Sequence, residues 1–197
     1  MSKRLFDIIF SFLGIVILFP ILIVISILVK LVSPGPVFYR GERIGRFGKP
    51  FRVYKFRTMV VDAEEKGGPS TAADDPRLTK IGNFLKKYQL DELPQLINVL
   101  IGEMSLVGPR PEVKVYIDMF SEEEKRTILS VRSGMTDLAS LWNFHEGNIL
   151  KGSSDPEKTY MEKIRPEKIR LQIKYVKERS FLGDIKIILK TILKIFR

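Results

Sequence analysis

The sequence predicts an α/β fold in a small membrane-associated domain. We expect a short antiparallel sheet, an N-terminal membrane helix that is broken by a proline and re-enters on one face, and amphipathic helices at the membrane interface. Three observations predict this class. An apolar run over 8–29 is long enough to cross a bilayer core. The segments 37–40 and 51–56 are rich in β-branched and aromatic residues, and apolar residues recur at helical spacing in 78–88 and 181–197.

The composition narrows the class of partner. The chain has 197 residues, a formal net charge of +10 and no cysteine. This length accommodates one globular domain with an accessory segment. The positive charge predicts an anionic partner, which is a nucleic acid, a phospholipid or a phosphorylated small molecule. Without cysteine the chain has neither disulfides nor thiolate metal ligands.

The N-terminal run predicts a membrane-anchoring segment over 1–33, followed by a cytoplasmic domain over 34–197. Pro20 lies near the middle of the run and removes a backbone donor, so we expect the helix to kink or break there. Lys3 and Arg4 precede the run, further basic residues follow it, and positive residues stay on the cytoplasmic side. A bent helix that enters and leaves by the same face satisfies both flanks. A single span with a mild kink is the equally favoured alternative.

The two predicted strands are separated by a segment with Gly41, Gly45 and Gly48. Their spacing matches neither common nucleotide-binding fingerprint, so a loose hairpin is favoured over a phosphate-binding loop. In the second strand Lys55 and Arg57 alternate with apolar residues, which places both cations on one face. Taken alone, this pattern is typical of a solvated strand face.

The segment 62–75 is polar and rich in glycine, serine, threonine and alanine. It predicts a surface loop with a short helical piece over 62–66, and a lid over a site is the less favoured alternative. The following helix, over 78–88, lies either on the membrane surface or on the core.

The stretch 90–96 is the centre of the sequence. Asp91 and Glu92 precede Pro94 and an apolar run that ends at Gly102, so we expect a helix to start near Asp91. The two carboxylates then lie at the positive end of the helix dipole, which favours the ionised form. We expect Asp91 to attack a phosphate. For an isolated Asp-Glu pair, a capping role is the commoner explanation.

Arg110 lies between Pro109 and Pro111, and the two prolines fix the backbone on either side of it. A guanidinium held in this way is suited to bidentate recognition of a phosphate. Alone, the segment is also compatible with a structural turn.

Three segments together carry a resemblance: 54–59 (YKFRTM), 90–96 (LDELPQL) and 104–111 (MSLVGPRP). In order and spacing they resemble three signatures of the bacterial sugar transferases, which are monotopic polyprenyl-phosphate phosphoglycosyl transferases. The N-terminal helix with its proline is similar too. The resemblance covers essentially the whole chain, which looks like the minimal catalytic form of the family.

The resemblance implies transfer of a sugar 1-phosphate from a nucleotide sugar, such as a UDP-sugar, to a polyprenyl phosphate such as undecaprenyl phosphate. It also implies a ping-pong reaction through a phosphosugar on Asp91, release of UMP, and the start of surface glycan assembly. The implied location is the bacterial inner membrane, with the catalytic domain on its cytoplasmic face. Membrane lipid is a further implied partner, no nucleic acid is expected, and a homo-oligomer is left open.

The resemblance also implies roles for individual residues. Asp91 and Glu92 are the implied catalytic residues and the implied ligands of Mg²⁺. The implied substrate-binding residues are Lys55, Arg57, Lys86, Pro109, Arg110 and Pro111.

The chain departs from the family at several positions. Phe19 replaces the serine that usually precedes the proline of the membrane helix, and Lys86 replaces an arginine, which removes the bidentate fork. Asp137 is either a substrate contact of this branch or a local helix cap, and the cap is favoured. Gln172 falls near an acidic position that assists metal binding in some relatives, so Asp137 or Glu146 is the candidate replacement.

The C-terminal third reads as helices. Ser121 precedes three glutamates, which predicts an N-cap and an acidic first turn. His145 is more often structural than catalytic, and Trp142 is expected in the core or at an interface. A long charged helix over 155–179 is expected to be interrupted near Pro166, and its cations are expected on a solvated face, as is usual for such a helix.

The last segment carries a stripe of basic residues beside an apolar face. This pattern predicts a helix on an anionic membrane surface or, equally, one packed on the core with a wet basic face. The stripe consists of Lys186, Lys190, Lys194 and Arg197.

Three rival functions are compatible with parts of the sequence. A membrane-anchored protein that binds an anionic ligand would use the charge without chemistry. A catalytically inactive scaffold for glycan enzymes would turn over no nucleotide sugar. An ordinary glycosyltransferase would release a nucleoside diphosphate, although the chain offers no Asp-X-Asp metal motif.

Overall fold

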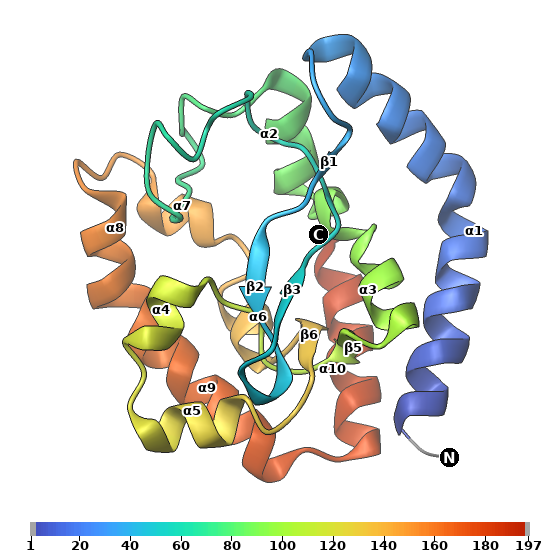
Figure 1. Ribbon diagram of the computed structural model, residues 1–197, viewed down its shortest axis with the longest axis vertical. Coiled ribbons are helices and arrows are strands. Elements are labelled where there is room, and N and C mark those ends of the chain that lie inside the picture. The colour runs from blue at the N-terminus through green and yellow to red at the C-terminus, as the bar shows by residue number, and fades with distance from the viewer. Residues whose placement is uncertain (1–2, 196–197) are drawn as a thin grey trace.

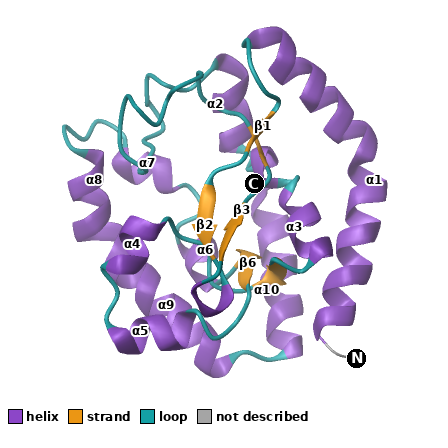
Figure 2. Ribbon diagram, viewed as in Figure 1, coloured by secondary structure: helices purple, strands orange, loops and turns teal. Residues whose placement is uncertain are grey.

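The computed structural model describes residues 3–195, and most of them are helical (Figures 1 and 2). The helices are α1 (Lys3–Val32), α2 (Lys80–Lys87), α3 (Gln95–Ile101), α4 (Lys114–Asp118), α5 (Glu122–Ile128), α6 (Leu138–Trp142), α7 (Glu146–Leu150), α8 (Pro156–Thr159), α9 (Arg165–Glu178) and α10 (Phe181–Ile195). The shorter turns are η1 (Arg46–Gly48), η2 (Leu90–Glu92) and η3 (Tyr160–Ile164). The strands are β1 (Phe38–Tyr39), β2 (Glu42–Ile44), β3 (Pro50–Arg52), β4 (Lys55–Phe56), β5 (Met104–Val107) and β6 (Ser133–Thr136). The prediction of mixed helices and short antiparallel pairs, preceded by one long apolar helix, is confirmed.

Helix α1 runs along one side of the domain and curves over its end (Figure 1). It is long and apolar enough to cross a membrane, and most of its apolar side chains are exposed. Of the predicted kink or break at Pro20, the break is wrong, because the helix continues through this residue. One proline removes one backbone donor, and a long apolar helix tolerates that loss. Ser11 and Ser26 donate to the carbonyls of Ile8 and Leu22, within their own turns.

The first strands form two antiparallel pairs. Strand β1 pairs with β4, with Phe38 opposite Phe56, and β2 pairs with β3. The turn of the β2–β3 hairpin contains Gly45 and Gly48, and Gly48 has φ 74°. The hairpin predicted from the glycine spacing is confirmed.

Strands β5 and β6 form a parallel pair that the sequence did not predict. Beyond the end of β5, the segments that contain Gly108 and Gly134 approach each other so closely that neither glycine has room for a side chain. A Cβ on Gly134 would lie 2.0 Å from the amide nitrogen of Gly108. This contact fixes the backbone just before Arg110, because Gly134 N also donates to Pro109 O at 2.9 Å.

Helix α2 begins after Thr79, whose hydroxyl accepts from Gly82 N at 2.9 Å, as an N-cap does. Its apolar residues Ile81 and Leu85 pack against Ile25 and Val29 of α1. The predicted helix is therefore present, and its apolar face packs on the core and on α1.

The loop before α2 is ordered around an arginine. Arg77 pairs with Asp75 at 2.7 Å and donates to the carbonyls of Ala63 and Gly68. The piece over 62–66 is a series of turns, so the predicted short helix is wrong. The amide of Glu65 bonds to Asp62 O three residues back, and no helix follows because glycines come directly after it.

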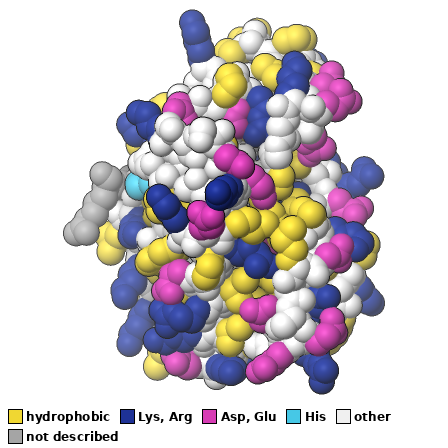
Figure 3. Space-filling view, turned by 90° about the vertical axis from the view of Figure 1, so that its left-hand side faces the viewer, with side chains coloured by type: hydrophobic (Ala, Val, Ile, Leu, Met, Phe, Trp, Pro, Cys, Tyr) yellow, Lys and Arg dark blue, Asp and Glu magenta, His cyan; other side chains and the backbone are white. Residues whose placement is uncertain are grey.

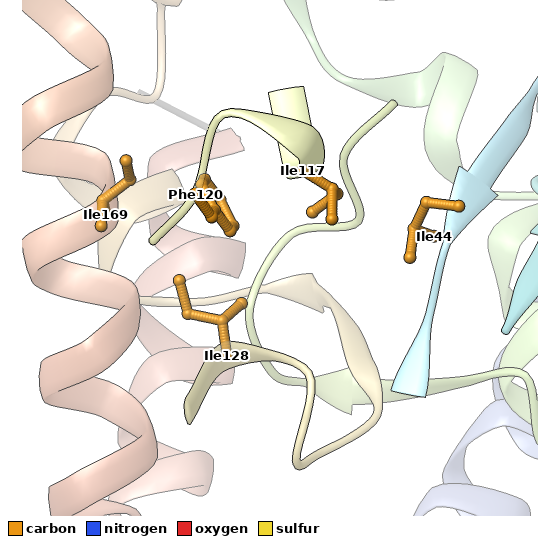
Figure 4. Packing of buried hydrophobic residues seen from close by; sticks show 5 residues of the cluster. All are labelled: Ile44, Ile117, Phe120, Ile128 and Ile169. Carbon is orange, nitrogen blue, oxygen red and sulfur yellow. The ribbon is translucent and has the colours of Figure 1, made fainter. Parts of the chain in front are cut away.

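A cluster of isoleucines and one phenylalanine joins the hairpin to the C-terminal helices (Figure 4). Ile44 of β2 lies at one end of this cluster beside Ile117, and Ile169 of α9 lies at the other end beside Phe120. Helix α5 begins with the capping box of Ser121 and Glu124 that the sequence predicted in part.

The long charged helix is interrupted as predicted. Helix α9 carries Pro166 in its first turn, and the π turn η3 precedes it. The prediction of a solvated charged face is wrong for Lys168, which is buried. Its ammonium pairs with Glu112 at 2.7 Å and lies 3.1 Å from the Tyr160 hydroxyl.

Helix α10 has apolar residues both on the face that packs on the core and on its exposed side. Ile187 packs on the core with Val107 and Tyr175, whereas Leu182, Leu189 and Leu193 are exposed on the opposite side. Packing on the core is therefore confirmed for one face. Lys186, Lys190 and Lys194 are exposed, and Arg197, the last member of the predicted basic stripe, lies outside the described residues.

Candidate active site

The turn η2 presents Asp91 and Glu92 at the end of a sharp change in chain direction. Gln89 precedes it in the left-handed region, with φ 53°, and its side-chain amide donates to Phe144 O at 2.9 Å. The predicted helical start near Asp91 is the 3-10 turn η2, which begins at Leu90, whereas the α-helix α3 starts only at Gln95. Pro94 has no N–H to extend the α-helical pattern backwards, and the preceding turn is 3-10.

Glu92 is held by two cations from different parts of the chain. Lys55 of β4 donates to Glu92 Oε1 at 2.7 Å. Arg110 forms two hydrogen bonds with the same carboxylate, one of them to Oε2 at 3.0 Å. These partners hold the pKa of Glu92 well below its usual range, although burial acts in the opposite direction. The three signatures of the sequence thus meet at one carboxylate.

Asp91 lies beside this cluster, but its carboxyl group has different surroundings. Asp91 is 7% exposed, and its carboxyl group accepts no hydrogen bond from any residue between 3 and 195. Burial and the neighbouring charge of Glu92 raise the pKa of Asp91, while Lys55, Lys86 and Arg110 lower it in part. The pKa of Asp91 therefore moves upward, in the direction opposite to the one expected from a helix dipole. The dipole is weak here because Asp91 lies outside the short helix α3.

Lys86, in the last turn of α2, contributes positive charge near Asp91. Its ammonium group forms no hydrogen bond or ion pair within the described part of the chain. Burial lowers the pKa of Lys86 to about 8, although the charge of Asp91 acts in the opposite direction. Lys86 is thus a cation available to an anionic ligand.

Arg57 lies apart from the cations around Glu92. Its guanidinium donates to the carbonyls of Ser33 at 2.7 Å and Pro34 at 2.5 Å, and its side chain is buried. In this position it binds the end of α1. The predicted substrate contact of Arg57 stays a prediction.

Pro109 and Pro111 flank Arg110, as the sequence requires. Pro109 O accepts from Gly134 N, and Gln172 donates to the backbone carbonyl of Arg110 at 3.5 Å. The segment is held on both sides of the arginine, which keeps its fork directed at Glu92.

The candidate replacements for the acidic family position have separate roles. Asp137 is fully buried and its Oδ1 accepts from Ser140 N at 2.7 Å, so it caps α6 and the predicted cap is confirmed. Burial raises its pKa. Gln172 is also buried, and Glu146 accepts from Asn143 at 3.3 Å.

Asn98 is a functional neighbour that sequence reasoning missed. It is fully buried in α3, accepts from Tyr54 N at 2.9 Å, and donates to Arg52 O at 2.9 Å and to Glu103. It therefore ties the helix after Glu92 to the end of β3 and to Tyr54, the residue directly before Lys55. Its signal was an amide in the otherwise apolar run 96–101.

Asp91 and Glu92 are the candidate ligands of a metal ion. Neither Asp91 oxygen accepts a hydrogen bond from the described residues, and Glu92 Oε2 accepts from Arg110 alone. In residues 3–195 no group of three or more His, Cys, Asp or Glu side chains is placed to hold a metal ion. Mg²⁺ is usually held by one or two carboxylates with water and substrate phosphates, so the two residues fit this ion.

Comparison with known proteins adds independent information. The family model described as "Bacterial sugar transferase" matches residues 1–197. A putative undecaprenyl-phosphate N-acetylgalactosaminyl 1-phosphate transferase of Bacillus subtilis (strain 168) is 49% identical over 121 residues, which are 61% of this chain and 68% of that protein.

Two further relatives match almost the whole chain. The UDP-glucose:undecaprenyl-phosphate glucose-1-phosphate transferase of Escherichia coli (strain K12) is 39% identical over 98% of this chain and 40% of its own length. The exopolysaccharide production protein PSS of Rhizobium leguminosarum bv. phaseoli is 38% identical over 96% of this chain and 92% of its own length. The chain thus spans two fifths of the Escherichia coli relative and nearly all of the Rhizobium relative. Together with the three signatures that meet at Glu92, these matches show that the chain belongs to the bacterial sugar transferase family.

Proposed function

We propose that the protein transfers a sugar 1-phosphate from a UDP-sugar to a polyprenyl phosphate, with release of UMP. The observation that carries this proposal is the state of Asp91. It is a buried carboxylate that accepts no hydrogen bond from the described residues, and Lys55, Lys86 and Arg110 supply positive charge around it. The names of the relatives support the choice of a UDP-sugar and undecaprenyl phosphate.

In the first step, an oxygen of Asp91 attacks the phosphorus next to the sugar. The bond between this phosphorus and the bridging oxygen breaks, and its electron pair leaves with UMP. The attack meets like-charge repulsion, which the fixed cations Lys55, Lys86 and Arg110 offset. When bound, Mg²⁺ would neutralise phosphate charge beside Asp91 and Glu92.

In the second step, a phosphate oxygen of the lipid attacks the same phosphorus. The bond to Asp91 breaks, the carboxylate is restored, and the product is a sugar linked to the lipid by a diphosphate. Dividing the transfer in this way lets a soluble donor and a lipid acceptor use one pocket in turn.

The outward side of α1 supports a place at the membrane. Its exposed side chains are almost all apolar, and Ile17 and Leu31 are more than 70% exposed. The face of the domain away from α1 instead carries basic and acidic side chains interspersed over much of its surface (Figure 3). Water suits this charged face, and lipid suits the outward side of α1.

The inward side of α1 supports a re-entrant helix. The domain contacts this helix near both ends, through Arg4 and Asp7 at its start and through Ile25 and Val29 near its end. A helix of this length is about 45 Å long, enough to cross the hydrocarbon core of about 30 Å. A lone span would carry its two ends to opposite sides of the bilayer, away from a domain that binds both. We therefore place both ends of α1 at the cytoplasmic face of the inner membrane.

This placement brings the candidate active site close to the membrane surface. A site at headgroup level would receive the phosphate of the lipid while its chain stays in the bilayer. The name of the Rhizobium relative supports a role in exopolysaccharide production. Within that role, we propose that the transfer opens the assembly of an exopolysaccharide or another surface glycan.

The test is intact-protein mass spectrometry of the detergent-purified chain after incubation with Mg²⁺ and a panel of UDP-sugars without lipid. The proposal predicts a mass increase equal to one sugar phosphate, which Asp91→Asn abolishes. Asp118→Asn is the matched control, because Asp118 is an exposed carboxylate paired with Lys114. An adduct that persists in Asp91→Asn refutes the assigned nucleophile. UMP release on addition of lipid without any adduct indicates direct displacement instead.

A further inference from the structure

The first turns of α1 bind the segment that joins the two halves of the active site. Arg4 donates to Val99 O at 2.6 Å and to Leu100 O at 2.9 Å, at the end of α3. The last carbonyls of a helix lack partners within the helix, and a cation there also interacts favourably with the helix dipole. Arg4 therefore acts as a cap on α3, supplied by a helix about 95 residues earlier in the chain.

A second contact lies one helical turn further along α1. Asp7 is buried, and its Oδ1 accepts from Leu106 N of β5 at 3.1 Å. A charged side chain is rarely buried without a partner that stabilises it. Arg4 and Asp7 thus bind two consecutive elements, the end of α3 and the middle of β5.

These two elements lie between the catalytic signatures. Helix α3 starts three residues after Glu92, and β5 ends three residues before Arg110. A shift of α3 relative to β5 would therefore change the pairing of Glu92 with Arg110. Misplacement by about 1 Å can cost an enzyme about 100-fold in rate.

From these contacts we infer that Arg4 and Asp7 are positioning residues for the active site, so that α1 is part of the catalytic scaffold as well as a membrane anchor. The inference rests on the proposed function, because it takes the cluster around Glu92 as the site of transfer. It goes beyond anchoring, which requires only apolar side chains and flanking positive charge.

The chain provides a matched control for charge. Lys3 carries the same charge beside Arg4, at the same end of α1, but it pairs with Asp184 of α10 instead of binding α3. If Arg4 only attracts the membrane surface, removing Lys3 and removing Arg4 have similar effects. If Arg4 positions α3, only its removal slows the chemistry.

The experiment compares Arg4→Ala, Arg4→Lys, Asp7→Ala, Asp7→Asn and Lys3→Ala as full chains in lipid nanodiscs. Steady-state release of UMP gives kcat and the KM values for donor and for undecaprenyl phosphate. We expect Arg4→Ala and Asp7→Ala to lower kcat about tenfold or more, with KM for the donor changed less than about twofold. Arg4→Lys keeps a cation but loses the fork, and Asp7→Asn keeps an acceptor oxygen, so both recover part of kcat.

Hydrogen–deuterium exchange over 90–110 provides a readout that needs no turnover. We expect faster amide exchange in this segment for Arg4→Ala, and no change for Lys3→Ala. Equal kcat in Arg4→Ala and Lys3→Ala, or unchanged exchange over 90–110 in Arg4→Ala, overturns the inference. A wild-type chain that forms no adduct and releases no UMP refutes the proposed function instead, and the exchange result still decides whether α1 positions this segment.

Discussion

Replacing Lys86 by arginine tests whether this cation serves the donor. Burial lowers the pKa of Lys86 to about 8, so the side chain is charged below this pH and neutral above it. The groups that act on it are Asp91, Glu92 and Glu146, which favour the charged form, and Lys55, which disfavours it. The ammonium fraction falls about tenfold between pH 7 and pH 9 for a pKa of about 8. If the charged form binds the donor phosphates, kcat/KM for the donor falls by about the same factor.

The assay is UMP release at low donor concentration from pH 6 to pH 10, because kcat/KM reports on the free enzyme. Arginine stays charged over this range, so Lys86→Arg is expected to lose the decline that is centred near pH 8. Lys87→Arg is the matched control, since Lys87 is exposed in the same turn of α2. If the Lys86→Arg profile superimposes on that of the wild type, Lys86 does not carry the alkaline decline and the reasoning is refuted.

Three further substitutions test how the site is held together. Lys168→Met leaves Glu112 buried without its partner and is expected to cost about 3–5 kcal/mol of unfolding free energy; a double variant that also carries Glu112→Leu should recover most of it in thermal unfolding. Gly134→Ala places a Cβ 2.0 Å from Gly108 N, so we expect loss of folded protein in the detergent extract, and normal yield would contradict the close approach. Asn98→Ala removes three hydrogen bonds in the core, with an expected cost of about 2–4 kcal/mol; denaturant titration measures it, and a cost below about 1 kcal/mol would show that the buried amide links are dispensable.

Local signals in the sequence predicted the elements that depend on near neighbours. The β2–β3 hairpin follows from its glycines, the start of α5 from Ser121, and the interruption before α9 from Pro166. Each depends on backbone properties of a few consecutive residues, which can be recognised without a structure.

The sequence did not predict the contacts between segments that lie far apart in the chain. The strands β5 and β6 are short and lie almost 30 residues apart, so no turn signal joins them. Lys168 lies in a charged helix and was expected in water, because its partner Glu112 belongs to a distant segment. The same reason applies to Arg4, whose position before an apolar run indicates a membrane flank. Its contacts with α3 exist only in the folded chain.

For the candidate site, the sequence identified the members but not their pairing. It placed Asp91, Glu92, Lys55 and Arg110 in one centre through three separate signatures, and the structure brings the last three into contact. The upward shift of the pKa of Asp91 was not predicted, because it depends on burial. Burial results from the packing of the whole domain, and a local motif gives no measure of it.

The contrast between the two adjacent carboxylates follows from the turn that carries them. In a 3-10 turn consecutive side chains project about 120° apart, so Asp91 and Glu92 cannot enter the same set of contacts. Glu92 projects toward Lys55 and Arg110 and stabilises their charge, whereas Asp91 is left without a hydrogen bond from the described residues. A carboxylate that is paired twice is a poor nucleophile, because its lone pairs are occupied and its charge is neutralised. The short turn before Pro94 therefore separates Glu92, which holds the cations, from Asp91, the proposed nucleophile.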